Sequence, residues 1–194
     1  MVVTAVVPIR SFQGMTRLSD ELTSAQRREL SEHLATTVVD AASRAGLTVV
    51  VVSDDPEVRE WASGKLCVIA SDGDTGTGQG LNRSVTQAVA GLGWGAWIVL
   101  HADLPLIDPA IVSRVADEVA EGRSVVCPSL DGGTNAIAGW GPFDFAYGPG
   151  SFTNHLSKLP DAKVIVDRAI AIDIDTIGHY TALRTLGRTP SLAS

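Results

Sequence analysis

The chain has 194 residues, 45% of them hydrophobic and 19% charged, and its formal net charge is −7 at pH 7. This composition is typical of a globular domain and excludes an intrinsically disordered chain. The negative charge, together with the lack of a Lys/Arg-rich run in the sequence, disfavours a nucleic-acid-binding surface. We expect a single domain over 1–194 with a loose tail at 187–194.

Localisation and oxidation state are predicted from the N-terminus and the cysteines. Residues 1–8 lack a basic segment and are too short for a signal peptide or a membrane span. Cys67 and Cys127 lie in apolar stretches and match no metal-binding spacing, so we expect reduced core thiols. The sequence therefore predicts a soluble cytoplasmic protein without nucleic-acid or membrane partners. It leaves the oligomeric state open, with a homodimer as one option.

The first seventy residues alternate between β-branched runs and helical patterns. The expected strands are 2–7, 47–52 and 67–70, and the expected helices are 24–44, with Ser24 as its cap, and 56–63. This order is half of a doubly wound nucleotide-binding fold, whose strands share one carboxyl edge. We therefore predict an α/β fold, a single Rossmann-like domain with a mostly parallel central sheet and helices on both faces.

Two loops in this half are candidates for binding a nucleotide. Arg10 and Arg17 follow the first strand and suit a polyphosphate, although solvated surface arginines are an equal alternative. The segment 72–80 is rich in glycine, which permits close approach to a ligand but is also typical of linkers. It has neither the P-loop nor the dinucleotide fingerprint. A helix is expected over 81–92, with Asn82 near its start. Two roles for Asn82 have equal weight: contact with a base or ribose, or capping of this helix.

The apolar run 97–100 predicts a short strand that is buried on both faces of a parallel sheet. Asp103 follows this run, at the edge where open α/β sheets bind their ligands. A buried carboxylate without a partner is costly, and a divalent cation is the partner that we favour. The alternative is that Asp103 caps the next helix. Asp108, directly before Pro109, is better placed for that role.

Two glycine-containing bends, 131–135 and 145–152, mark the second half of the chain. Further helices are expected at 110–121, 151–156 and 179–186, and further strands at 124–128, 136–138 and 169–175. Ser151 is a candidate cap, and an anion bound at that helix start and a purely structural turn have equal weight. Asp173 and Asp175 lie two residues apart, so a strand would place both on one face, either at a ligand or in solvent.

Six segments run in a recognisable order from the first loop to the last predicted strand. They are Arg-Leu-Ser at 17–19, Gly-Leu-Asn at 80–82, Ala-Asp-Leu-Pro-Leu at 102–106, Gly-Gly-Thr-Asn-Ala at 132–136, Tyr-Gly-Pro-Gly-Ser-Phe at 147–152 and Asp-Ile-Asp-Thr at 173–176. Asp-Leu-Pro-Leu alone is shared by many nucleotidyltransferases, whereas Gly-Gly-Thr-Asn followed by Tyr-Gly-Pro-Gly-Ser-Phe-x-x-His is far more specific. With these segments the chain resembles the 2-phospho-L-lactate guanylyltransferase family, including its phosphoenolpyruvate guanylyltransferase members.

This resemblance implies an enzyme that joins GMP from GTP to a small phospho-acid and releases pyrophosphate, in the biosynthesis of coenzyme F420. The acid would be 2-phospho-L-lactate, phosphoenolpyruvate or 3-phosphoglycerate, and the fold would be like that of the molybdenum-cofactor guanylyltransferases. The cofactor would be Mg²⁺. The residues that match the family's functional positions are Asp103, Asp173 and Asp175 for the metal, Asp103 and Arg17 for catalysis, Arg10, Arg17, Gly80 and Asn82 for the nucleotide, and Thr134, Gly148 and Ser151 for the acid.

The chain also departs from the family pattern. Relatives usually have lysine where Arg10 stands and a second lysine where Met15 stands, in a loop that is one residue longer. His101 replaces a small residue or proline, and Ile-Gly at 177–178 replaces a proline. Two other interpretations stay open at this point. One is a sugar-phosphate or molybdopterin nucleotidyltransferase, and the other, suggested by Met15, is a catalytically weakened nucleotide-binding protein.

Overall fold

The computed structural model describes residues 2–65, 67–70, 80–185, 187 and 192, and of residues 67–70 only the backbone. The glycine-rich segment 72–79, most of the predicted tail 187–194 and the side chain of Cys67 lie outside the described part. The cysteine whose side chain is described, Cys127, is buried and free. Among the described residues, no helix has the length and apolar character needed to cross a membrane.

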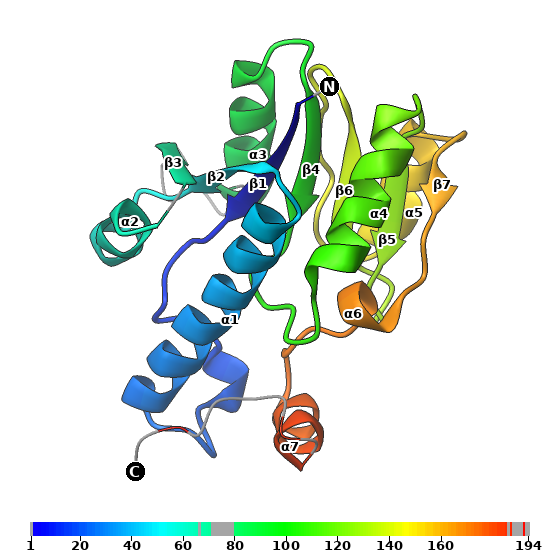
Figure 1. The fold of residues 1–194 in the computed structure, drawn as a ribbon. Coiled ribbons are helices and arrows are strands. Elements are labelled where there is room, and N and C mark those ends of the chain that lie inside the picture. The colour runs from blue at the N-terminus through cyan, green and yellow to red at the C-terminus, as the bar shows by residue number, and fades with distance from the viewer. Residues whose placement is uncertain (1, 66, 71–79, 186, 188–191, 193–194) are drawn as a thin grey trace.

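A single sheet of seven strands in the order β3-β2-β1-β4-β6-β5-β7 forms the centre of the fold (Figure 1). The strands are β1 (Val3–Pro8), β2 (Thr48–Val52), β3 (Cys67–Ala70), β4 (Ala96–Leu100), β5 (Val125–Pro128), β6 (Thr134–Trp140) and β7 (Lys163–Val164). The helices are α1 (Ser24–Arg44), α2 (Pro56–Ser63), α3 (Gly80–Gly91), α4 (Pro109–Ala120), α5 (Ser151–Lys158), α6 (Arg168–Ala171) and α7 (Ile177–Thr185), with a short 3-10 helix at Thr16–Leu18. Strand β6 runs antiparallel to both of its neighbours, and the other strand pairs are parallel.

Helices cover both faces of the sheet, as predicted. One apolar cluster joins one face to α1, α2, α4 and α6, and a second joins the other face to α3 and α5 (Figure 1). Strand β4 shows how the sequence produces this sandwich, because its alternate residues enter different clusters: Ile98 and Leu100 the first, Trp97 and Val99 the second. Every residue of β4 is buried, which explains its continuous apolar run.

Local side chains set the helix starts. Helix α4 begins at Pro109, and the carboxylate of Asp108 accepts the N–H of Ile111, so the predicted cap is confirmed. Helix α1 is capped by Thr23 in a capping box with Gln26, so the prediction of Ser24 as the cap is wrong by one residue.

The predicted strand at 169–175 is wrong. The carboxylate of Asp167 accepts the N–H of Ala169 and caps the single helical turn of α6. The alternating isoleucines therefore do not extend the sheet. The chain leaves α6 and passes the carboxyl end of β4, where the N–H of Ile174 donates to the carbonyl of Asp103 at 3.2 Å. This crossing carries Asp173 and Asp175 to the predicted site by a route that the periodicity did not show.

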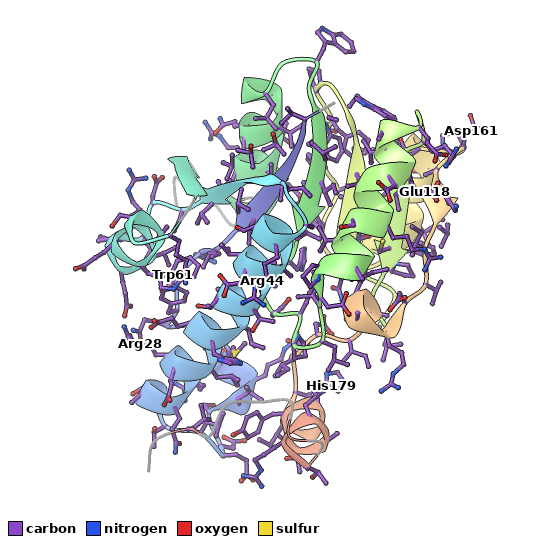
Figure 2. The ribbon with its side chains drawn as sticks, in the orientation of Figure 1. Arg28, Arg44, Trp61, Glu118, Asp161 and His179 are labelled. Atoms are coloured by element: carbon purple, nitrogen blue, oxygen red, sulfur yellow. The ribbon has the colours of Figure 1, made fainter. Side chains whose placement is uncertain are left out.

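Ion pairs join neighbouring elements at the surface. Arg28 on α1 pairs with Glu57 on α2, close to Trp61, which packs edge-on against Phe12 (Figure 2). Toward the β7 edge of the sheet, Glu118 of α4 pairs with the ammonium of Lys163 at 2.5 Å (Figure 2). Such exposed pairs add little stability, because water screens them. The buried clusters therefore hold the fold together.

Candidate active site

A cavity of about 380 Å³ opens at the carboxyl edge of the sheet, between the ends of β1 and β4 and the start of α3. Its lining includes Arg10, Met15, Gly80 and Asp103. The chain moves outward from β1 in one direction through β2 and β3 and in the other through β4, so this is the topological switch point of the sheet. Open α/β sheets bind their ligands at such a point, and the volume is in the range of small-molecule sites.

Asp103 has an unusual environment within this cavity. Its Oδ1 is buried and has no hydrogen-bond partner among the described residues. Burial, and then the charges of Asp175 and Asp131, raise the pKa of Asp103 to about 6. Burial and the charge of Asp103 also raise the pKa of Asp173. The site therefore holds more negative charge than its own residues neutralise, which fits a cationic ligand.

The third predicted metal ligand is occupied differently. The carboxylate of Asp175 forms an ion pair with the guanidinium of Arg17, and both side chains are largely exposed. Within the described ranges, no group of three or more His, Cys, Asp or Glu side chains is arranged to hold a metal ion. The structure therefore brings the charges of Asp103, Asp173 and Asp175 close enough to interact, and the carboxylate of Asp175 is in addition paired with Arg17 of the first loop.

Thr134 and Ser151, predicted to bind the acid, lie side by side although 17 residues separate them. Their hydroxyl oxygens are 3.4 Å apart, and each residue is only 2% exposed. Thr134 is the first residue of β6 and Ser151 the first residue of α5. The cap of α5 is Gly150, with φ +69°, so the prediction of Ser151 as the cap is wrong by one residue.

The two glycine bends are tied to each other. The N–H of Ser151 donates to the carbonyl of Gly148 at 3.0 Å, and the N–H of Phe152 donates to the carbonyl of Gly132 at 3.4 Å. These two amides at the start of α5 are therefore already used. The predicted contact with an anion therefore depends on the hydroxyls of Thr134 and Ser151 and not on these two amides. Gly148 lies beside them with φ +128°, a conformation that side chains disfavour.

Gly133 is required by close packing. A Cβ at this position would lie 2.6 Å from the hydroxyl of Ser129 and 3.1 Å from the carboxylate of Asp131. That carboxylate also accepts the N–H of Gly133 at 3.0 Å. The bend therefore has one tightly specified shape, and it delivers Thr134 to the start of β6.

The segment before α5 has no regular structure, and side chains replace the hydrogen bonds that a sheet would supply. Three successive backbone N–H groups donate to side chains. The acceptors are Thr86 for Phe145 at 3.3 Å, His155 Nε2 for Ala146 at 3.0 Å, and Asn82 Oδ1 for Tyr147 at 2.6 Å. The amide nitrogen of Asn82 also donates to the carbonyl of Tyr147 at 3.0 Å.

These contacts give Asn82 and His155 a structural connection that was not predicted from the sequence. Asn82 connects α3, which borders the cavity, to the loop at Tyr147. Its direct contact with a nucleotide stays a prediction. His155 also lies at this junction, in contact with Ala146 and Thr134, although no role was predicted for it from the sequence. The signal for it was its place at the end of the Tyr-Gly-Pro-Gly-Ser-Phe-x-x-His segment.

The cavity and the hydroxyl pair flank the end of β4. The N–H of His101 donates to the carbonyl of Asn135 at 3.0 Å, and its ring lies 5.0 Å from the ring of Tyr147. On the other side, His101 and Asp103 line the cavity, whereas Thr134 and Ser151 do not. The strand end that bears Asp103 therefore lies next to both the cavity and the hydroxyl pair, the two regions predicted to bind ligands.

The raised pKa of Asp103 predicts that Asp103→Asn stabilises the protein in the absence of divalent cations. The pKa of about 6 in the folded state lies above 3.8, the pKa of an unperturbed aspartate. Above pH 6 the folded state therefore holds a buried charge at a cost of about 3 kcal/mol, and this cost disappears as the pH falls from about 6 to about 4. Urea unfolding with a chelator, at about pH 8 and about pH 5, measures the difference.

The matched control is Asp161→Asn, at an exposed carboxylate far from the site (Figure 2). Its free energy of unfolding should stay within about 0.5 kcal/mol of wild type. Equal stability of wild type and Asp103→Asn at the higher pH would contradict the burial of this charge.

Comparisons with known proteins agree with this architecture. Residues 3–179 match the family model described as "Guanylyl transferase CofC like". The phosphoenolpyruvate guanylyltransferase of Rubrobacter xylanophilus is 38% identical over 96% of both chains. The 2-phospho-L-lactate guanylyltransferase of Haloarcula marismortui is 31% identical over 87% of this chain and 79% of its own.

A solved structure of a putative nucleotide-diphospho-sugar transferase from Desulfovibrio desulfuricans shares the fold, with a TM-score of 0.74. It covers 98% of this chain and 90% of its own, but at 13% sequence identity it is evidence for the fold alone. The family match and the curated relatives cover nearly the whole chain, glycine bends included. The chain therefore belongs to the CofC-like guanylyl transferase family.

Proposed function

We propose that this protein transfers GMP from GTP to a small phospho-acid, releasing pyrophosphate. The observation that carries the proposal is the Oδ1 of Asp103, which has no hydrogen-bond partner in the part of the chain that the structure describes. Asp103 lines a cavity of a size suited to a nucleotide, at the sheet edge that also carries a buried pair of hydroxyls. Relatives named phosphoenolpyruvate and 2-phospho-L-lactate guanylyltransferase support this choice of substrates. The sugar-phosphate and molybdopterin alternatives have only a similarity of fold behind them.

In this proposal the cavity receives the nucleotide. Arg10 lines it and Arg17 lies on the same loop, so their guanidinium groups would bind the β- and γ-phosphates. Gly80, at the start of α3, lets the backbone approach the nucleotide without a side chain in the way. Asn82 supports this side by fixing α3 to the loop at Tyr147.

The acid would bind across the end of β4, at Thr134, Ser151 and Gly148. The two hydroxyls offer hydrogen bonds to a phosphate or carboxylate, and Gly148 leaves its backbone open to the ligand. No Cβ contact would arise at Gly148 within 4 Å, so there is room beside it. The small polar surface suits a compact acid better than a sugar ring, which presents many hydroxyls.

The reaction needs positioning more than proton transfer. An oxygen of the acid's phosphate attacks the α-phosphorus in line, a new P–O bond forms, and the bond to the β-phosphate oxygen breaks as pyrophosphate leaves. The attacking oxygen is already an anion at neutral pH, so no strong general base is required. Holding the two anions in contact, with arginines neutralising the leaving group, is the contribution of the protein.

We further propose Mg²⁺ as the cofactor, held by Asp103 and Asp173, with Asp175 as the third candidate once it leaves Arg17. Two observations support this assignment: within the described ranges the Oδ1 of Asp103 has no hydrogen-bond partner, and the pKa values of Asp103 and Asp173 are raised. Magnesium retains several waters and needs few protein ligands, which suits this sparse donor set. When bound, it supplies charge neutralisation to the reacting phosphates.

A pyrophosphate-release assay tests the function directly. Each of GTP, ATP, CTP and UTP is combined with phosphoenolpyruvate, 2-phospho-L-lactate, 3-phosphoglycerate or a sugar 1-phosphate, with and without magnesium. We expect magnesium-dependent release with GTP and a phospho-acid, and loss of turnover by orders of magnitude in Asp103→Asn. Release only with a sugar phosphate, or with no acceptor at all, would overturn the proposal.

The hydroxyl pair predicts a separation of Michaelis constants. Ser151→Ala and Thr134→Val each remove one hydrogen bond to a charged ligand, worth about 1.5–3 kcal/mol, so the KM of the phospho-acid should rise about 10- to 150-fold. The KM of GTP should hardly change, because the pair lies outside the cavity. A loss confined to GTP would place the nucleotide at this pair instead.

Met15 gives a gain-of-affinity prediction. It lines the cavity in the left-handed region, with φ 57°, at the position where the family resemblance expects a lysine. Met15→Lys should strengthen GTP binding by at most about 1.5–3 kcal/mol, the worth of one charge-assisted contact. Met15→Gln is the neutral control and should leave the affinity near that of wild type. Equal titration curves for all three proteins would show that the loop directs residue 15 elsewhere.

A further inference from the structure

His155 is fully buried on α5, and both of its ring nitrogens have partners. Nε2 lies 3.0 Å from the backbone nitrogen of Ala146, and Nδ1 lies 2.9 Å from the hydroxyl oxygen of Thr134. A backbone N–H can only donate, so Nε2 must be the acceptor. The single proton of the neutral ring is then on Nδ1, and the ring donates to Thr134.

The ring is neutral at the pH where an enzyme of this kind works. Burial, and then the charge of Lys158, lower the pKa of His155 to about 4. The aromatic rings of Phe143, Phe145 and Tyr147 surround it, with the Tyr147 centroid 4.9 Å away. The imidazole is therefore fixed in both orientation and tautomer.

The tautomer of His155 determines how many hydroxyl protons of Thr134 and Ser151 are free to donate to a ligand. Thr134 and Ser151 carry one O–H proton each, and the 3.4 Å contact between them uses one. The ring of His155 donates its own proton to the hydroxyl of Thr134, so neither the Thr134 hydroxyl nor the Ser151 hydroxyl needs to donate to the ring. One proton of the pair is left to point outward. With the opposite tautomer, Thr134 would donate to Nδ1 and Ser151 to Thr134, and no proton would remain.

We infer that His155 is a positioning residue that turns the Thr134–Ser151 pair into a hydrogen-bond donor for an anionic oxygen of the acceptor acid. The inference rests on the proposed function for the identity of that ligand, but the tautomer itself does not. A phosphate or carboxylate oxygen only accepts hydrogen bonds, so a pocket without an outward donor would repel it. Through the ring of His155, the backbone N–H of Ala146 thereby sets the direction of the hydrogen bonds at the hydroxyl pair.

Two substitutions separate the two ring nitrogens. His155→Asn keeps an amide near the position of Nδ1, where it can donate to Thr134, and loses the contact with Ala146. His155→Gln reaches the position of Nε2 and can accept from Ala146, but it leaves Thr134 without its donor. We expect His155→Gln to raise the KM of the phospho-acid about tenfold and His155→Asn to stay near wild type, with the KM of GTP unchanged in both.

A purely structural role gives a different pattern. If His155 had only a structural role, the KM of the phospho-acid would rise in both variants in proportion to their loss of thermal stability, or the KM of GTP would change as well. Either result overturns the inference. In the Thr134→Val background, His155→Gln should add little further loss, because its partner is already missing. Additive losses would also overturn it.

The tautomer is measured without any substrate. Two-bond ¹H–¹⁵N spectra of the wild-type protein distinguish a protonated Nδ1 from a protonated Nε2. The His155 signals are those that persist when each of the other three histidines, His33, His101 and His179, is replaced by Gln in turn. We expect protonation at Nδ1, and protonation at Nε2 would refute the inference even if both variants failed to fold. Wild-type protein that lacks turnover with every phospho-acid would instead refute the proposed function, whichever tautomer the spectra show.

Discussion

The antiparallel pairing of β6 with β4 is the constraint on which the site depends. In this register Leu100, the last residue of β4, lies opposite Ala136, near the beginning of β6. The start of one strand and the end of the other therefore share an edge, which a parallel crossover would not provide. Asp103 follows β4 and Thr134 begins β6, so the carboxylate and the hydroxyl pair become neighbours without a long loop. The sheet itself therefore brings together the two regions proposed to bind the substrates.

Irregular backbone beside this edge is held by side chains instead of strands. Thr86, Asn82 and His155 accept the three successive N–H groups of the segment before α5. Two of these acceptors belong to the helix that borders the cavity, and the third belongs to α5. A buried backbone donor without a partner would cost about 1–3 kcal/mol, so each acceptor fixes the loop as well as stabilising it. The shape of the segment before α5 is therefore coupled to both α3 and α5.

The sequence predicted the fold class and most element positions, because those depend on local patterns. It also pointed to several residues that the structure brings together, such as Thr134 and Ser151. An uninterrupted apolar run before Asp103 identifies a central strand end, and the glycine bends point to Thr134 and Ser151. It failed where a single side-chain contact competes with periodicity, as at Asp167, whose cap converts an apparent strand into a helical turn. It could not give the tautomer of His155, which depends on a backbone donor placed by the tertiary fold.

A third apolar cluster lies apart from the two that sandwich the sheet. Its buried members come from the first loop, the start of α1 and the C-terminal region; they are Leu18, Leu22, Leu30, Leu34, Ile174, Tyr180 and Leu183. Figure 1 shows α7 away from the sheet, near the start of α1. Arg17 and Asp175 each directly adjoin a member of this cluster in sequence, and they pair with each other. If this third cluster opened by itself, Arg17 and Asp175 would move away from the site while the central strands stayed protected from hydrogen exchange. The free energy of the opening that affects ligand binding can therefore differ from the free energy of global unfolding in this chain.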